Sequence, residues 1–224
     1  MSVKAIEIKS RLATTPAKDP QYALKVQLKN GEFLQVADPR ATRAMVALMD
    51  TEAMLGGTTS HYGGPAAFAE LMSAVHGLMF YQSKMKKKEW HEIFHFVNDA
   101  GHCENGLYAL KANYQFSGLS LNDLKKFRSI ESKLTGHGEA HLFAEGVLVS
   151  NGPLGSGLPQ AQGLAVGDAL NFNKRMTICA LSDGGAMEGE AREAFAAIPG
   201  LAKKGKLAPF ICIVSDNRTK LSGR

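Results

Sequence analysis

The sequence predicts an α/β protein with a doubly wound parallel sheet, helices on both faces of that sheet, and a small β extension at the N-terminus. Its second half alternates helical and strand-like segments: a small-residue helix over 158–171, an apolar run over 176–181, a helix-like stretch, and a second apolar run over 209–214. This alternation is typical of strand–helix–strand units, in which the strands are parallel. Residues 1–38 differ, because apolar and polar side chains alternate there as they do in hairpins.

The N-terminal extension contains three strand-like segments. Residues 5–9 and 24–28 alternate, and Asn30-Gly31 predicts a tight turn into a further strand over 33–36. We therefore expect a β-hairpin extension over residues 1–38, separate from the domain that follows.

From residue 39 onward the pattern is helical, and residues 39–224 form the main expected domain. The helices are expected over 41–55, which Gly56-Gly57 ends, over 66–81, over 104–114 and over 119–132, the last with Ser120 or Asn122-Asp123 as its N-cap. A strand-like segment, 146–150, precedes the small-residue helix. Because the chain ends soon after its last apolar run, we expect this domain to be incomplete at the C-terminus.

Bulk composition limits the possible classes of protein. The chain has 224 residues, 45% of them hydrophobic, and a net charge of +5. These values describe an ordinary globular protein, and the mild charge suits anionic metabolites better than nucleic acid. No apolar run reaches the ~18–20 residues of a membrane span, and no signal sequence is apparent. The three cysteines are scattered; Cys179 and Cys212 stand in strand-like runs and are expected to be plain buried thiols, and a cytoplasmic location fits this pattern.

Polar residues follow both apolar runs of the second half. Asp183 stands in the segment Ser182-Asp183-Gly184-Gly185, and Asn217 follows Ser215-Asp216. A carboxylate and an amide oxygen at one sheet edge, with glycines that let the backbone approach closely, suit Mg²⁺ and a diphosphate. A helix beginning near Gly185 would turn its free N–H groups toward the anion.

Other loops carry groups that suit acid–base chemistry. Gly152-Pro153-Leu154-Gly155 precedes the small-residue helix. Three histidines lie in glycine-containing loops: His61 in Ser-His-Tyr-Gly-Gly-Pro, His102 in Ala-Gly-His, and His137 in Gly-His-Gly. Histidines in such loops are candidate proton donors and acceptors for a bound ligand.

Over about residues 40–224, the chain resembles the diphosphate-binding part of transketolase. The resemblance lies in six motifs that occur in this order: SHYGGP, AGH, GHGE, GPLG, DGGAMEG and SDN. The resemblance implies the thiamine-diphosphate-binding fold, with Mg²⁺ held by Asp183, Asn217 and the main-chain oxygen of Thr219. It implies that Gly184 and Asn217 touch the diphosphate and that His61 and His137 face the substrate. The remaining implied roles are contact with the cofactor by His102, Gly152, Pro153 and Leu154, and a relay across a dimer interface by Glu188.

The implied activity is transfer of a two-carbon ketol unit between sugar phosphates. In this family a second, pyrimidine-binding domain or C-terminal subunit completes the site, and no such domain is found in this sequence. We therefore expect the chain alone to be inactive and to work in a homo- or hetero-oligomer.

The sequence also departs from the family pattern. Ser182 replaces a usual glycine, and the interval from Asp183 to Asn217 is longer than usual. Segments 54–57 and 219–223 resemble the E1 components of 2-oxoacid dehydrogenases, which is the alternative assignment.

A rival motif, His91-Glu92-Ile93-Phe94-His95, matches the H-E-x-x-H pattern of zinc metalloproteases. On a helix both histidines would share one face, and Glu92 would act as a base. No third ligand stands at a suitable distance, and the flanking residues, Trp90 and Phe96-Val97, suit a short strand or turn, so this function is a distant alternative. Dinucleotide and P-loop motifs are not met either, since Gln160 replaces the third glycine after Gly155-Ser156-Gly157 and no G-K-[ST] occurs.

Overall fold

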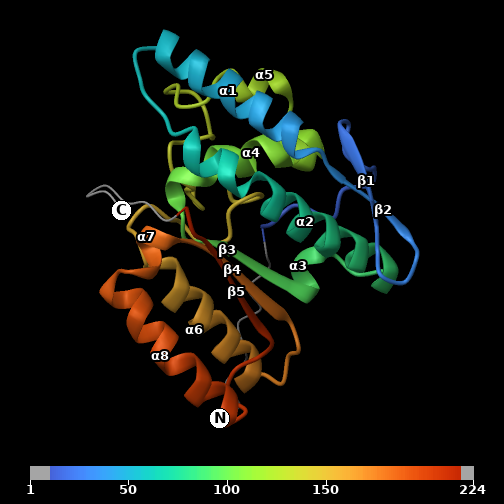
Figure 1. Ribbon diagram of the computed structural model, residues 1–224, viewed down its shortest axis with the longest axis vertical. Coiled ribbons are helices and arrows are strands. Elements are labelled where there is room, and N and C mark those ends of the chain that lie inside the picture. The colour runs from blue at the N-terminus through green and yellow to red at the C-terminus, as the bar shows by residue number, and fades with distance from the viewer. Residues whose placement is uncertain (1–10, 218–224) are drawn as a thin grey trace, which may run out of the picture.

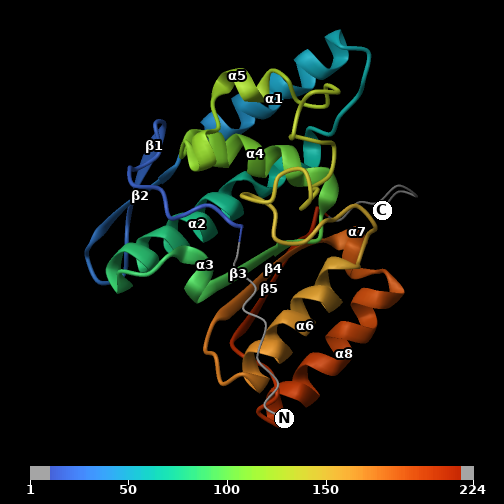
Figure 2. The ribbon, with the colours of Figure 1, turned by 180° about the vertical axis from the view of Figure 1, so that it is seen from behind.

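The computed structural model describes residues 11–217 of the chain. Within this range a three-stranded parallel sheet is covered by helices on both faces, which confirms the predicted fold class (Figure 1). Figure 2 shows the same layers from behind, with α6 (Gly157–Leu170) and α8 (Gly189–Lys203) on one side of the sheet. On the other side lie α1 (Pro39–Leu55), α2 (Gly63–Lys86), α4 (Glu104–Asn113) and α5 (Leu121–Leu124). The strand expected at 5–9 and the proposed ligand Thr219 lie outside the described residues.

The sheet has the order β3-β4-β5, with β3 at Phe94–Asn98, β4 at Met176–Ser182 and β5 at Phe210–Ser215. Both apolar runs of the second half therefore form the expected strands. The register pairs Val97 with Cys179 and Ser182 with Ser215. Because the strands are parallel, the residues that follow β4 and β5 emerge at the same edge.

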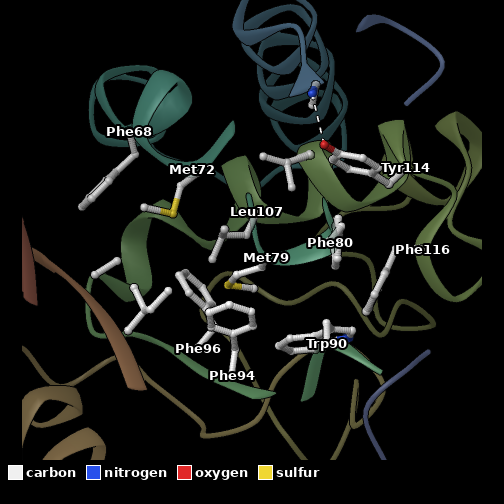
Figure 3. Close-up of a cluster of buried hydrophobic side chains, with 14 of the residues drawn as sticks. Phe68, Met72, Met79, Phe80, Trp90, Phe94, Phe96, Leu107, Tyr114 and Phe116 are labelled. Atoms are coloured by element: carbon white, nitrogen blue, oxygen red, sulfur yellow. Dashed lines mark hydrogen bonds between the residues drawn. The ribbon is translucent and has the colours of Figure 1, made fainter. Parts of the chain in front are cut away.

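Alternate side chains of the strands pack into two hydrophobic cores, one on each face of the sheet. On one face, Phe94, Phe96 and Ile178 pack in an aromatic cluster with residues of α2 (Gly63–Lys86) and α4 (Glu104–Asn113). Figure 3 shows this cluster between the sheet and α2. On the other face, Val97, Cys179 and Leu181 pack against α6 (Gly157–Leu170) and α8 (Gly189–Lys203). The small residues of α6 permit this close contact.

A third core lies farther from the sheet. There α1 (Pro39–Leu55) and α4 enclose Val46, Met49, Tyr108 and Phe143, with Leu124 from the short helix α5 (Leu121–Leu124). Four further short elements occur in the described residues: α3 (Trp90–Ile93), the 3₁₀ helix η1 (Gly101–Cys103), the 3₁₀ helix η2 (Phe116–Gly118) and α7 (Asp183–Ala186).

The expected hairpin is present as β1 (Ala23–Gln27) paired antiparallel with β2 (Phe33–Ala37). Gly31 in the turn has φ of +87°, a conformation that glycine adopts without strain. Ala37 is buried in the aromatic core, and its N–H is donated to the hydroxyl of Tyr114 at 3.3 Å (Figure 3). The end of the hairpin is thus part of the main core, whereas β1 is exposed.

Two local expectations are wrong. The helix expected over 119–132 is confined to α5, and turns follow it in which Arg128 has φ of +62°. The segment 146–150 forms a loop rather than a strand. Its Val147 is buried by side-chain packing, and its N–H bonds back to the carbonyl of Phe143 at 2.9 Å, so burial occurs without strand pairing.

The zinc-protease alternative is not supported by the structure. His91 lies on α3, whereas His95 lies on β3, so the two histidines share no helix face. Glu92 accepts a hydrogen bond from the N–H of Glu89 as part of a capping box, and Nε2 of His95 meets a guanidinium nitrogen of Arg175 at 2.7 Å. Among residues 11–217, no three His, Cys, Asp or Glu side chains group as a metal site.

The three cysteines are free thiols, as the sequence suggested for Cys179 and Cys212. Cys103 and Cys179 are buried, and Cys212 is partly buried. Burial raises the pKa of each thiol, so none is activated as a thiolate. In the described part of the chain, no helix has the length and apolar character needed to cross a bilayer.

Candidate functional site

Asp183 and Asn217 meet at the carboxyl edge of the sheet. Asp183 is the first residue of α7 (Asp183–Ala186), directly after β4, and Asn217 follows β5. The backbone N–H of Asn217 is donated to Oδ2 of Asp183 at 3.3 Å, and that of Gly184 to Oδ1 at 2.9 Å. The structure therefore brings together the two residues that the sequence predicted as partners.

Ser182, which replaces a family glycine, is the N-cap of α7. Its Oγ accepts a hydrogen bond from the N–H of Gly185 at 3.0 Å. The helix thus begins two residues earlier than expected, and the Gly185 N–H is bonded to a side chain rather than free. The sequence departure has a structural role, because a serine at this position satisfies a helix-end donor.

The three glycine-flanked histidines converge around His102, which also interacts electrostatically with Asp183. The rings of His61 and His102 are 5.5 Å apart, centroid to centroid, in an edge-on arrangement. Burial lowers the pKa of His102, and the neighbouring charges of His61 and His137 lower it further, whereas the carboxylate of Asp183 acts in the opposite sense. His102 is thus held neutral at pH 7, able to accept a proton, at the centre of the group.

Close backbone packing places His137 beside the loop that begins at Gly152. A Cβ added at Gly101 would lie 2.8 Å from both His137 Cδ2 and the Gly152 nitrogen, so only glycine fits there. Gly152 itself has φ of +137°, and a Cβ added to it would lie 3.6 Å from Cγ of His137. These glycines hold the His102, His137 and Gly152 loops against one another.

A buried polar network lies behind these loops. The side-chain amide of Asn98 is donated to Oε2 of Glu104 at 2.7 Å, and that of Asn151 to the same oxygen at 3.0 Å. Asn151 Oδ1 accepts the N–H of Gly138 at 2.7 Å. Glu104 is 2% exposed, and the ammonium of Lys111 lies 3.9 Å from its other oxygen. The network ties the His137 and Gly152 loops to the end of β3.

A second buried amide positions the His61 loop. Asn105, at the start of α4, donates hydrogen bonds to the carbonyl of His61 at 2.8 Å and to Oδ1 of Asp50 at 3.2 Å. Burial raises the pKa of Asp50, against the lowering effect of its hydrogen bonds to Ser60 and Asn105.

The remaining predicted residues lie at the rim of the site. Pro153 and Leu154 are exposed, and so is Glu188 at the N-cap position of α8. Gly155 has φ of +80°, and a Cβ there would lie 2.6 Å from Cβ of Glu188. The Gly-Pro-Leu-Gly loop and Glu188 are therefore neighbours.

The sequence did not single out several residues that build the site. Each of these stands within four residues of a predicted motif, but no motif marks it: Asn98, Asp99, Glu104, Asn105 and Asn151. Their nearness in sequence to the motifs is the signal that was available.

The fold and this site define an α/β cofactor-binding domain whose polar groups gather at the carboxyl edge of parallel strands. Residues 40–224 match the family described as transketolase, thiamine diphosphate binding domain. The match covers most of the chain, and the chain belongs to this family.

Named relatives agree with this assignment. The chain is similar to transketolase of Nostoc sp., with 34% identity over 188 residues, 80% of this chain and 27% of the relative. It is 30% identical to transketolase of Rhodobacter capsulatus and 31% identical to that of Scheffersomyces stipitis, over 80% of the chain and 27% of each relative. The chain thus spans about a quarter of the length of these relatives.

Proposed function

We propose that this chain is the diphosphate- and Mg²⁺-binding part of a transketolase-like enzyme, which transfers a two-carbon ketol unit between sugar phosphates. The observation that carries the proposal is the meeting of Asp183 and Asn217 at one sheet edge, beside His61, His102 and His137. Family membership supports the cofactor, and the geometry supports the residues assigned to it.

The residues present fit a diphosphate with its metal. Mg²⁺ usually takes one or two protein carboxylates and fills its other positions with phosphate oxygens and water. Asp183 supplies one carboxylate, Asn217 an amide oxygen, and the main-chain oxygen of Thr219 is proposed as the third protein ligand. Gly184 and Asn217 would contact the diphosphate, and the cofactor would pack against these rim and loop residues: His102, Gly152, Pro153 and Leu154.

When bound, thiamine diphosphate supplies an electron sink for making and breaking a carbon–carbon bond. The chain's own part is positioning and proton transfer. His61 and His137 are exposed and would exchange protons with sugar hydroxyl groups. His102, whose lowered pKa keeps it neutral, would donate or accept one hydrogen bond without adding positive charge.

We also propose that the active enzyme needs a pyrimidine-binding domain or C-terminal subunit in addition to this chain. Glu188, exposed beside the Gly155 loop, would face that partner across a homo- or hetero-oligomeric interface. The chain alone would then lack ketol transfer. The division between residues 1–38 and 39–224 and a cytoplasmic location belong to the same proposal.

The test is calorimetric titration of the chain with thiamine diphosphate, with and without Mg²⁺. Binding should require Mg²⁺, and Asp183→Asn should abolish this Mg²⁺-dependent binding. Glu193→Gln, at an exposed position of α8, is the matched control and should bind normally. Absence of Mg²⁺-dependent binding by the unaltered chain would contradict the proposal.

The substrate that is cleaved distinguishes the proposed function from the 2-oxoacid dehydrogenase alternative. A mixture of the chain with a pyrimidine-binding partner should cleave a ketose phosphate and leave pyruvate intact. Pyruvate decarboxylation by that mixture, without ketose cleavage, would favour the alternative.

A further inference from the structure

Asp99 is a fully buried carboxylate at the end of β3, with 0% exposure. Its backbone extends the sheet, since its N–H is donated to the carbonyl of Ala180 at 2.7 Å. Its own carbonyl accepts the N–H of Gly101 at 2.9 Å, which turns the chain toward His102. The residue therefore stands where β3 leads into the histidine cluster.

The side chain of Asp99 reaches the loop and helix on the other side of the site. Oδ1 accepts the N–H of Gly157 at 2.6 Å, and Oδ2 accepts that of Gly155 at 3.1 Å. The N–H of Leu158 is a third donor to the carboxylate. One side chain thus fixes both the end of the Gly-Pro-Leu-Gly loop and the first turn of α6.

The same carboxylate lies against the turn that carries Asp183. A Cβ at Gly185 would stand 2.6 Å from Oδ2 of Asp99, and a Cβ at Gly157 would stand 2.8 Å from Cα of Asp99. Real Cβ atoms do not approach so closely, so glycine is required on both sides. Asp99 contacts the two segments to which the proposed function assigns the cofactor.

The three N–H donors explain why a charged group is buried here. A carboxylate accepts several hydrogen bonds at once, and hydrogen bonds to a charged acceptor are stronger than those to a neutral one. An asparagine in this place would turn its NH₂ group toward an N–H group, leaving one donor unpaired and two donors facing each other.

We infer that Asp99 is a positioning residue that holds the Gly-Pro-Leu-Gly loop and the Asp183 turn in their ligand-binding arrangement before the ligand arrives. The inference rests on the proposed function, because it takes thiamine diphosphate with Mg²⁺ as that ligand. Preorganisation of this kind raises affinity, since the ligand does not have to order the loops itself.

The first test measures affinity and stability together in Asp99→Asn. The dissociation constant of thiamine diphosphate at saturating Mg²⁺ should rise about ten- to hundredfold, which corresponds to the loss of one charge-assisted hydrogen bond. Asp168→Asn is the matched control, because Asp168 is also a buried aspartate, at the far end of α6. The control should bind the cofactor with unchanged affinity. An Asp99→Asn variant that is less stable yet binds as tightly as the unaltered chain would overturn the inference.

A pair of alanine substitutions within α6 covers the case in which Asp99→Asn does not fold. Gly157→Ala pushes on Asp99, whereas Gly163→Ala meets no atom within 4 Å. Gly157→Ala should weaken cofactor binding, and Gly163→Ala should leave it unchanged. Equal affinity in both variants would contradict the inference.

Hydrogen exchange of the chain without ligand separates this inference from the proposed function. The amides of Gly155 and Gly157 should be protected in the unaltered chain and should exchange at least tenfold faster in Asp99→Asn. If the unaltered chain shows this protection but binds no cofactor, the proposed function fails while the positioning contact stands. If the exchange rates do not differ, the positioning role fails whatever the chain binds.

Discussion

Removal of the Glu104 carboxylate should destabilise the chain more than most single substitutions. In Glu104→Ala the side-chain amides of Asn98 and Asn151 lose their shared acceptor, at 2.7 and 3.0 Å, and the buried ammonium of Lys111 loses the carboxylate 3.9 Å away. Breaking a buried ion pair on one side typically costs about 3–5 kcal/mol. That is a large part of the roughly 5–15 kcal/mol by which a domain is stable.

The assay is urea unfolding followed by circular dichroism. A fall in the free energy of unfolding by about 3–5 kcal/mol, with an unchanged dependence on urea, is the expected result. Glu104→Gln keeps an oxygen for the two asparagines and removes only the charge next to Lys111, so its loss should be smaller. Glu193→Ala, at an exposed position of α8, should change stability by no more than about 0.5 kcal/mol. A loss below about 1 kcal/mol in Glu104→Ala would refute the reasoning, because buried donors without a partner should cost more than that.

Three further predictions concern the site and the buried histidines. Asn105→Ala should speed hydrogen exchange in the His61 loop and lower stability by about 1–3 kcal/mol, because the loop carbonyl and Asp50 lose a donor; unchanged exchange would count against it. Ser182→Ala should lower stability by about 1 kcal/mol in a thermal melt, through loss of the α7 cap, and no change would show that the cap is unimportant. Burial lowers the pKa of His95 to about 4 and that of His76 to about 3, from 6.5. Both histidines stay neutral in the folded protein while the unfolded chain takes up protons, so stability should be full above pH 6.5 and fall toward pH 4. Each should account for about 2 kcal/mol at pH 5, and pH-independent unfolding between pH 7 and pH 5 would contradict the assignment. Burial raises the pKa of three aspartates above 3.8, so above that pH the folded protein takes up protons on them more readily than the unfolded chain does. Their contribution to stability therefore increases as the pH falls, opposite to that of the histidines: Asp50, Asp99 and Asp168.

The sequence by itself determined strands β4 and β5 and the sheet edge at which Asp183 and Asn217 meet. Both strands are apolar runs followed by polar residues, and parallel strands necessarily end at one edge. The hairpin and the end of α1 at Gly56 were also predictable, because a turn or a helix end depends on residues close together in the chain.

Only the tertiary structure decided the elements whose state depends on distant partners. Residues 146–150 have the apolar character of a strand, but the N–H groups of Gly146 and Val147 bond back to the carbonyl of Phe143, and no strand pairs with this segment among the described residues. The H-E-x-x-H segment divides between α3 and β3 because Phe94 pairs in the sheet with Met176. A sequence pattern indicates which side chains can be buried. The segments that pack beside them in the fold determine whether they are buried in a strand, a helix or a loop.

The buried polar residues show the same division. The sequence identified three histidines in glycine loops, but their grouping around His102 depends on loops from separate parts of the chain. Glu104 bonds to Asn151, 47 residues away, and Asp99 bonds to Gly157, 58 residues away. A buried carboxylate is stable only with such donors around it, and one-dimensional spacing does not contain them. The sequence thus determined which ligand-facing groups the site has. The packing of the loops against the end of β3 decided which buried residues hold those groups in place.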